Sequence, residues 1–293
     1  MLLQEGLLSQ HITVELIDDS SKFEWSAANI ALAAFVKLKG IPWILAGKDP
    51  DQDLIIGLGR AGLYDPLTRQ ATQFIGFTAC FSARGIFKFV SLADVADTRE
   101  EYLNALRRVV VSSLEKAQQV GGNVMSLTLH MPKEMGQDED AIIVEAAKSY
   151  ATKHLPQISV VKVTDEAVYF AVDERSDTGL PARGTVIQMS DREYVLYTEG
   201  HEDSRTWRQR IPTALRIVPH EDLLSQHRVP ELIRQIHDLS QINWRAFNAR
   251  SQPISVHYGK EIARILSHVS RDAVKNLYSD KSREVLEERM WFI

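Results

Sequence analysis

The sequence predicts an α/β protein in which a mixed β-sheet is flanked by helices. The first observation is an apolar run over residues 53–61 that ends in glycines, which is typical of a buried central strand. The second is the order of elements over residues 72–163, where two strands reversed about a short turn precede helix, strand, helix and strand. Hairpin strands pair antiparallel and strands joined through helices pair parallel, so both kinds of neighbour are expected.

The segment before this central strand has its own pattern. Residues 6–17 give a short turn followed by a strand-like alternation. A helix follows, which Ser21 or Asp19 can cap and which Gly40-Ile41-Pro42 ends. Residues at helical spacing within it include Lys37.

Residues 48–53 are polar and predict a connection, so we divide the chain into domains of residues 1–47 and 48–293. A loop is expected over 60–70. The expected strands are residues 72–82, 85–92, 124–130, 158–163, 168–173, 184–190 and 193–198, with an extended piece over 205–218. The expected helices are residues 97–119, 138–153, 229–242, 258–269 and 281–290.

The composition is that of an ordinary globular chain. It has 293 residues, 44% of them hydrophobic and 25% charged. The sequence has neither a stretch of membrane-span length nor the layout of a signal peptide, so we expect a cytoplasmic protein. The single cysteine, Cys80, lies in an apolar run, which excludes a disulfide framework and a cysteine-based metal site.

The charge distribution is uneven. The net charge of −5 is unlike that of a typical nucleic-acid binder. Acidic residues gather at 49–53, 134–145 and 284–288, whereas basic residues crowd the last third of the chain. These basic residues are Arg205, Arg208, Arg210, Arg216, Arg245, Arg250, Lys260 and Arg264. A local basic groove is therefore compatible with the acidic total.

Several short strings occur in an order that resembles the MID–PIWI half of Argonaute proteins, especially prokaryotic ones. They are residues 29–37, 40–43, 56–59, 239–245, 253–259 and the apolar terminus 291–293. The resemblance covers nearly the whole chain and implies an RNase H-like PIWI domain over 48–293. It makes residues 1–47 the C-terminal part of a MID-like domain. The earlier MID helix of the family has no match, which implies a separate upstream chain or an incomplete piece.

The resemblance implies a binding site for the 5′-phosphate of a guide strand. Residues 6–10 are similar to the family's glycine-to-glutamine turn, so Gln10 would be one donor, and Lys37 matches the lysine of the following helix. The C-terminal carboxylate, on Ile293, would hold a divalent cation, Mg²⁺, against the phosphate. The family's polar residue one turn before the lysine is here Ala33, and Asn29 lies one turn further back. Taken singly, Gln10 also fits a solvated turn and Lys37 a cation at a helix C-terminus.

Nucleic-acid backbone contacts are expected from the basic residues of the last third. The candidates are Arg216, Arg245, Arg250, Lys260 and Arg264. For Arg245 and Arg250 a solvated loop is the alternative explanation.

Cleavage in the family needs carboxylates at defined places, because two-metal cleavage requires clustered acids to hold the cations. The resemblance sets Gly59 at the end of the first core strand, Pro132 after the fourth strand and Lys260 near the late helix, where the family carries metal ligands. A lysine at a metal-ligand position opposes metal binding through its own charge. We therefore expect no nuclease activity.

The resulting hypothesis is a catalytically inactive, short prokaryotic Argonaute-type protein. It would bind a guide RNA or DNA and a complementary target strand, with base pairing supplying the sequence specificity. Because it does not cleave, it would act through a separate effector or a MID/APAZ-containing partner chain, in defence against invading DNA.

Two alternatives stay open. The first is an active RNase H-like nuclease, dependent on Mg²⁺ or Mn²⁺, whose displaced ligands are Asp51, Asp53, His130 and Asp165. A lone histidine at a strand end such as His130 is also a common structural residue. The second is a protein-interaction scaffold, which would lack the salt-dependent oligonucleotide affinity that guide binding requires.

Overall fold

The computed structural model describes most of the chain. The described residues are 2–47, 52–64, 71–133, 135–153, 157–165, 169–200, 212–220, 223, 228–247, 249–269, 273–274 and 280–293.

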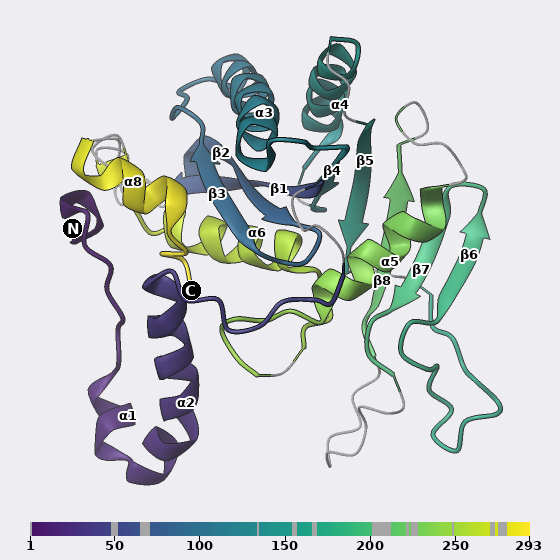
Figure 1. Cartoon of the computed structure of the whole chain (residues 1–293), viewed down its shortest axis with the longest axis horizontal. Helices are drawn as coiled ribbons and strands as arrows, with labels where there is room; N and C mark the ends of the chain where they lie inside the picture. The colour runs from purple at the N-terminus through teal and green to yellow at the C-terminus, as the bar shows by residue number, and fades with distance from the viewer. Residues whose placement is uncertain are drawn as a thin grey trace.

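One eight-stranded mixed sheet forms the centre of the molecule (Figure 1), as the sequence predicts. Its order is β3-β2-β1-β4-β5-β8-β7-β6. The strands β1, β4 and β5 run parallel, and every other neighbouring pair runs antiparallel. The bounds are β1 Asp53–Tyr64, β2 Ala71–Ser82, β3 Phe87–Leu92, β4 Ser126–Met131, β5 Gln157–Thr164, β6 Val186–Ser190, β7 Glu193–Tyr197 and β8 Ala214–Pro219.

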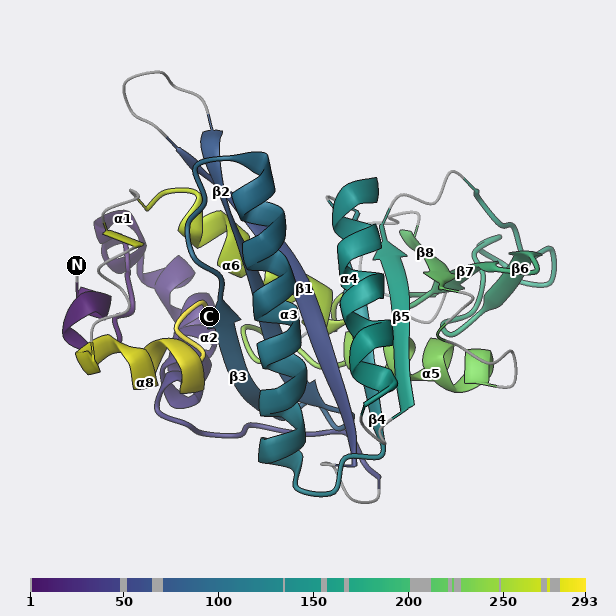
Figure 2. The ribbon, with the colours of Figure 1, turned by 90° about the horizontal axis from the view of Figure 1, so that it is seen from above.

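Helices cover both faces of the sheet (Figures 1 and 2). The helices α3 and α4 lie on one face, and α5 and α6 lie on the other. The helical bounds are η1 Leu2–Glu5, α1 Val14–Asp18, α2 Ser20–Lys37, α3 Arg99–Gly121, α4 Gln137–Ala151, α5 Val229–Ser240, α6 Ile254–Leu266 and α8 Asp280–Glu288.

The central strand β1 is buried on both faces. Its residues Leu54, Ile56 and Leu58 pack in the core under α3 and α4, while Ile55 and Ala61 pack in a second core with α6. All five side chains are at most 3% exposed. A strand covered on both sides needs apolar residues at every position, which explains the continuous run in the sequence.

Local capping accounts for the predicted helix starts. Asp19, one of the two expected caps, accepts a hydrogen bond from the Lys22 N–H at the start of α2. Thr98 and Glu101 form a reciprocal capping box at the start of α3. That helix ends at Gly121 and is capped by Gly122, whose φ of +68° favours glycine.

Two predicted strands are wrong. Residues 6–17 form no strand: Val14–Asp18 is the short helix α1, because the Thr13 hydroxyl accepts the Leu16 N–H as an N-cap. The described part of 168–173 is also irregular. There the Ala171 N–H donates to the Tyr197 hydroxyl, a side-chain partner in place of a neighbouring strand.

The central strand is longer than expected. Residues 60–64 continue β1 as far as Tyr64, where a loop was predicted, because they stay paired with β2 up to Ala71. The helix expected over 258–269 begins earlier, at Ile254, after Pro253. The first part of the extended piece over 205–218 lies outside the described residues, and β8 forms its end.

Residues 2–47 pack into the same core as α6 and the C-terminus. Leu32, Ala33 and Val36 of α2 belong to one apolar cluster with Tyr258 and Phe292. The division at residue 47 stays a prediction. In the portion of the chain described here, the helices are all too short or too polar to cross a membrane.

Candidate functional site

The structure brings three of the predicted site positions together. Gly59, Pro132 and Lys260 line one cavity of about 350 Å³, and Arg60 and Arg264 line it too. The reason is topological: β1 and β4 are parallel, so their C-terminal ends meet at one edge, and α6 packs across them. This edge is where open α/β sheets place their ligand sites.

The close approach of α6 to β1 explains the two glycines of β1. A Cβ on Gly57 would lie 2.2 Å from the backbone oxygen of Ser255, and a Cβ on Gly59 would lie 2.2 Å from the ring of Phe77. Both distances are far below van der Waals contact. A side chain at position 59 therefore needs the Phe77 ring to move.

The cavity is lined by basic and apolar side chains. Its described lining includes Arg60, Lys260 and Arg264 and contains neither Asp nor Glu. The Lys260 ammonium nevertheless has an anionic neighbour outside this lining, the Asp165 carboxylate at 3.0 Å.

A second acid organises the adjacent arginines. The Glu261 carboxylate accepts hydrogen bonds from Arg245 and, at 2.9 Å, from Arg264. Burial by itself would raise the pKa of Glu261. The hydrogen bond from Arg264 and the charge of Arg245 outweigh that effect, so the pKa is lowered. The pKa of His257 is lowered to about 4, mainly by burial and to a smaller extent by the positive charge of Arg250. Arg245, Arg250, Lys260 and Arg264 thus form one cluster on α6 and the loop before it, which we call the α6 basic cluster.

Arg216, the fifth expected backbone contact, is not part of this cluster. It lies on β8, where its guanidinium donates to Glu193 of β7 at 2.6 Å. Arg205, Arg208 and Arg210 lie outside the described residues.

The two residues expected at a guide phosphate are in contact. The Lys37 ammonium donates to the Gln10 side-chain oxygen at 2.7 Å and to the Ser9 carbonyl at 2.8 Å. Lys37 is only 7% exposed, and burial, with a smaller contribution from the Arg245 charge, lowers its pKa. Arg245 thereby connects this contact, electrostatically, to the α6 basic cluster.

The C-terminus lies beside the C-terminal end of α2 in both ribbon views (Figures 1 and 2). Ile293 is 7% exposed and shares an apolar cluster with Ala33 and Val36. The terminal carboxylate is an oxygen ligand of the kind that suits a hard cation. The Asn29 side-chain oxygen, eight residues before Lys37 on α2, is buried without a hydrogen-bond partner. Ala33 adds no donor.

The displaced ligands of the nuclease alternative are spread over the fold. Asp53 opens β1, six residues before Gly59, and accepts a hydrogen bond from Ser126. His130 is fully buried against the Ser255 hydroxyl at 2.7 Å, and burial lowers its pKa to about 3. Asp165 faces Lys260, and Asp51 lies outside the described residues. Within the described ranges, no three His, Cys, Asp or Glu side chains gather as a metal site would require.

Comparison with known proteins identifies the family. The model of the Piwi domain matches residues 1–271. The chain belongs to the Piwi domain family.

Two curated relatives agree with this assignment. The Piwi domain chain is 21% identical to the Protein argonaute of Cereibacter sphaeroides, over 100% of this chain and 40% of that protein. It is 25% identical to the Piwi protein of Archaeoglobus fulgidus, over 90% of this chain and 64% of that protein. The chain therefore spans less than two thirds of either relative.

Solved structures share the fold. Clostridium butyricum Argonaute bound to a guide DNA and a 19-mer target DNA has a TM-score of 0.66 at 20% identity, covering 92% of this chain and 35% of that one. Aa-Ago with externally bound siRNA has a TM-score of 0.63 at 17% identity, covering 100% of this chain and 37% of that one. The RNase H-like PIWI architecture expected from the sequence is confirmed.

Sequence reasoning missed a buried network behind the Gly59 cavity. Glu139 of α4 is fully buried and accepts from the Tyr102 hydroxyl at 2.6 Å, the Gly136 N–H at 2.7 Å and Arg60 at 3.2 Å. The available signal was Glu139 at the third position of a helix that starts after a glycine. Glu261 was also missed, because its i, i+3 spacing to Arg264 resembles an ordinary surface pair.

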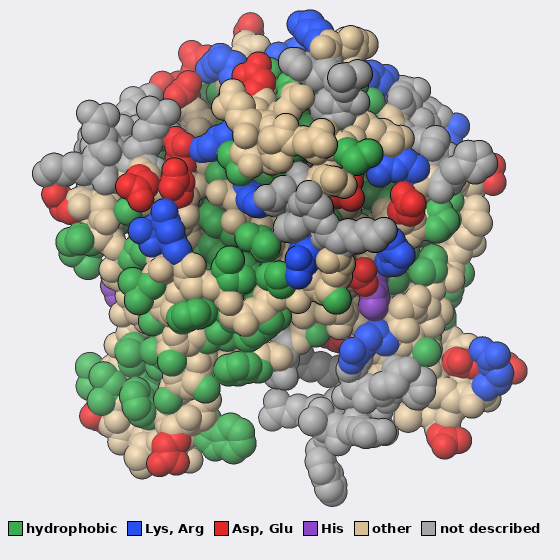
Figure 3. All heavy atoms as spheres, in the orientation of Figure 1, with side chains coloured by type: hydrophobic (Ala, Val, Ile, Leu, Met, Phe, Trp, Pro, Cys, Tyr) green, Lys and Arg blue, Asp and Glu red, His purple; other side chains and the backbone are tan. Residues whose placement is uncertain are grey.

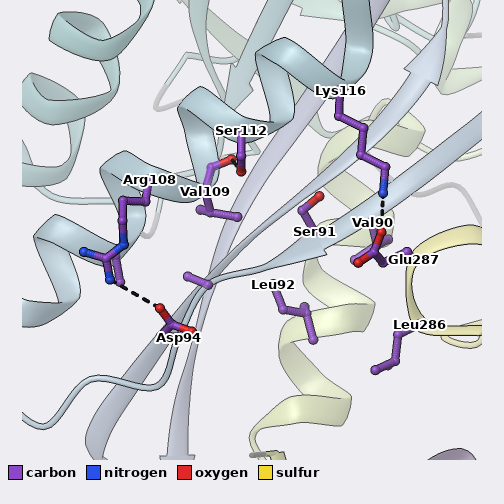
Figure 4. Close-up of a pocket in the computed structure, with 12 residues that line it drawn as sticks. Val90, Ser91, Leu92, Asp94, Arg108, Val109, Ser112, Lys116, Leu286 and Glu287 are labelled. Carbon is purple, nitrogen blue, oxygen red and sulfur yellow. Dashed lines mark hydrogen bonds and ion pairs between the residues drawn. The ribbon is translucent and has the colours of Figure 1, made fainter. Parts of the chain in front are cut away.

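Another cavity, of about 350 Å³, lies between β3, α3 and α8. Ion pairs between Arg108 and Asp94 and between Lys116 and Glu287 cross it (Figure 4). It contains none of the predicted site residues.

Proposed function

We propose that this Piwi domain binds a guide strand and its complementary target without cleaving either. The observation that carries the proposal is the composition of the Gly59 cavity. The three places where the family resemblance expects metal ligands hold Gly59, Pro132 and Lys260, and three cations line the same space. Positive charge suits nucleic-acid phosphates and opposes bound dications.

The 5′-phosphate of the guide would lie at Gln10 and Lys37. The ammonium has three donors and gives two of them to Ser9 and Gln10, so one remains for a phosphate oxygen. Burial strengthens that interaction, because the surroundings of Lys37 screen charge less than water does. Mg²⁺, if bound, would be held by the Ile293 carboxylate and the Asn29 oxygen, and would supply further positive charge beside the phosphate.

The guide–target duplex would pass along the α6 basic cluster. The Arg245 side chain, 39% exposed, is near enough to Lys37 to lower its pKa and shares the Glu261 carboxylate with Arg264, so it is suited to the phosphates that follow the first. The structure of Clostridium butyricum Argonaute with guide and target DNA, which shares this fold, supports the proposal.

A partner protein would convert target recognition into a response. The hairpin of α1 and α2 presents apolar side chains to solvent at one end of the molecule (Figure 3). The most exposed are Trp25 at 84%, Leu38 at 75% and Val14 at 66%. Exposed apolar surface of this kind marks protein contacts. We propose an effector or MID/APAZ-containing chain as the partner, in cytoplasmic defence against invading DNA.

The deciding experiment compares a 5′-phosphorylated single strand with its 5′-hydroxyl twin by fluorescence anisotropy at two salt concentrations. The phosphate is expected to raise the affinity, and Lys37→Met to remove that difference. Lys22→Met changes an exposed lysine of the same helix and serves as the control. Equal affinity for both strands, at every salt concentration, would refute guide-phosphate recognition.

Two further measurements separate the alternatives. Incubation of a guided target with Mg²⁺ or Mn²⁺ is expected to leave the target intact, and cleavage that Asp165→Asn abolishes would establish the displaced-ligand nuclease. Charge reversal at Lys260 is expected to weaken duplex binding, and unchanged affinity would exclude Lys260 from the groove. A protein that captures partners but shows no salt-dependent oligonucleotide affinity would be the scaffold, which the exposed apolar hairpin favours.

A further inference from the structure

A polar hollow of about 570 Å³ lies at the end of the sheet opposite the Gly59 cavity. Its floor is the first halves of β1, β4 and β5, its roof is α5, and residues 46–47 and 83–84 form a side wall. The six steps along β1 from Asp53 to Gly59 separate the two cavities by about 20 Å at the usual strand rise. The hollow is therefore distinct from the site described above.

The floor carries hydroxyl groups where a buried sheet normally carries apolar side chains. Ser126, Thr128 and Ser159 are 4%, 3% and 2% exposed, and Thr128 lies opposite Ser159 in the β4–β5 register. The Ser126 hydroxyl donates to Asp53. Those of Thr128 and Ser159 form no hydrogen bond within the described chain. The oxygens of these two hydroxyls are not fully covered by protein and line the hollow, so they are open to hydrogen bonds from whatever occupies it.

The roof and wall contribute further unused hydrogen-bonding capacity. A guanidinium nitrogen of Arg228, the residue before α5, and the side-chain oxygen of Gln235 on α5 are buried without partners. Arg84 is fixed at the wall by a 2.7 Å hydrogen bond from its Nε to the Leu45 carbonyl, which leaves its two terminal nitrogens for other acceptors.

The acids of the hollow, in contrast, already have donors or cations. Asp53 accepts from Ser126, Asp238 faces the His237 ring at 3.1 Å, and Glu231 lies 3.6 Å from Arg228. What remains is mainly donors: two hydroxyls and the guanidinium groups of Arg84 and Arg228. A ligand that satisfies them must bring acceptor oxygens, and it needs one donor for Gln235.

We propose that the polar hollow binds a small phosphate monoester that carries hydroxyl groups, of the size of a mononucleotide. Guanidinium groups recognise phosphate through paired, charge-assisted hydrogen bonds, and the hydroxyls of Thr128 and Ser159 complete the donor set. A hydroxyl of the ligand donates to Gln235. The volume falls within the range of roughly 300–1,000 Å³ that small-molecule sites occupy.

The experiment titrates the whole chain with 5′-AMP, ribose 5-phosphate, adenosine and inorganic phosphate by calorimetry, with melting temperatures recorded beside it. The two esters are expected to bind, and adenosine and free phosphate to bind much more weakly. The phosphorylated 5′ end of a nucleic-acid strand carries the same monoester, so the protein is also titrated with a 5′-phosphorylated pentanucleotide. Tighter binding of 5′-AMP identifies a free metabolite, and tighter binding of the pentanucleotide identifies a strand end.

Two near-isosteric variants test the floor. Thr128→Val and Ser159→Ala remove hydroxyls without partners, so they are expected to leave the melting temperature of the ligand-free protein unchanged or higher. Each is expected to weaken ester binding about tenfold or more, since each removes a hydrogen bond to a charged group. Ser113→Ala is the control, because its buried hydroxyl bonds to Thr78 at 2.6 Å, far from the hollow. It is expected to lower the melting temperature and to leave ester binding intact.

Lys37→Met separates the hollow from the guide-phosphate contact. Ester binding in the hollow is expected to be unchanged in Lys37→Met and to weaken about tenfold or more in Thr128→Val. The proposal would be overturned if Lys37→Met abolished ester binding and Thr128→Val did not. It would also be overturned if no ester bound, or if wild type and both floor variants bound the esters equally.

Discussion

Adding a single methyl group at Gly59 tests the packing that shapes the candidate site. The Cβ of Gly59→Ala would lie 2.2 Å and 2.4 Å from two ring carbons of Phe77. Carbon atoms in contact lie about 3.5–4.0 Å apart, so the ring must retreat by more than about 1 Å. Phe77 is fully buried in the core with α6, so its ring can move only by displacing other core side chains. Overpacking of this kind costs about 1–3 kcal/mol.

Two other glycines at the same contact give a graded comparison. At Gly57 the obstacle is the backbone oxygen of Ser255, which moves only with α6, so Gly57→Ala is expected to cost more than Gly59→Ala. At Gly259, on α6, the nearest atoms are 3.6 Å and 3.9 Å away. The methyl group of Gly259→Ala therefore fits, and the helix gains about 1 kcal/mol from replacing glycine.

Urea unfolding followed by circular dichroism measures the three free energies. The expected order of stability is Gly259→Ala, wild type, Gly59→Ala and Gly57→Ala, from most to least stable. Phe77→Leu combined with Gly59→Ala is expected to recover part of the loss. A Gly59→Ala protein as stable as wild type would refute the packing argument. Gly59→Asp, which puts a larger side chain at the same clash, is expected to destabilise further and to restore no cleavage.

Three further predictions concern buried and clustered charges. Burial lowers the pKa of His130 from 6.5 to about 3 in the folded protein. Below pH 6.5 the imidazole is therefore protonated in the unfolded protein and still neutral in the folded one, so the stability falls as the pH drops. Urea unfolding at pH 8 and pH 5 should show roughly 2 kcal/mol of loss from this group, absent in His130→Gln. Glu139→Ala leaves Arg60 and the buried Tyr102 hydroxyl without their acceptor. Thermal and urea unfolding should therefore show a free energy of unfolding that is lower by about 3 kcal/mol. Glu261→Gln removes the carboxylate that holds Arg245 and so frees this arginine to bind a phosphate. In anisotropy titrations, the plot of log affinity against log salt concentration should therefore become steeper by about one.

Each of these three results has a clear contrary outcome. An unchanged pH dependence in His130→Gln would mean that the imidazole does not stay neutral in the folded protein. A Glu139→Ala protein of wild-type stability would show that the network forms equally well with water. A shallower salt slope in Glu261→Gln would show that this acid holds Arg245 in its binding position and does not withhold it.

Patterns along the chain determined the architecture. The continuous apolar run of β1 required cover on both faces, and the capping residues Asp19 and Thr98 set helix starts through contacts only three residues long. The order of strands and helices determined which strands run parallel. The family-like strings predicted that Gln10 and Lys37 lie at one site, and the structure has the two side chains in contact.

Only the tertiary structure decided the remaining features. Residues 6–17 alternate like a strand, yet among the described residues they pair with no strand, and a local cap at Thr13 starts a helix instead. Arg216 is one of several basic residues in the last third of the chain, but its place on β8 brings it to Glu193 of β7 and not to α6. The packing of α6 against β1 explains Gly57 and Gly59, and the polar hollow exists because β4, β5 and α5 meet there. Periodicity and capping act over a few residues and can be read from the sequence, whereas these contacts join residues far apart in the chain and depend on how whole elements pack.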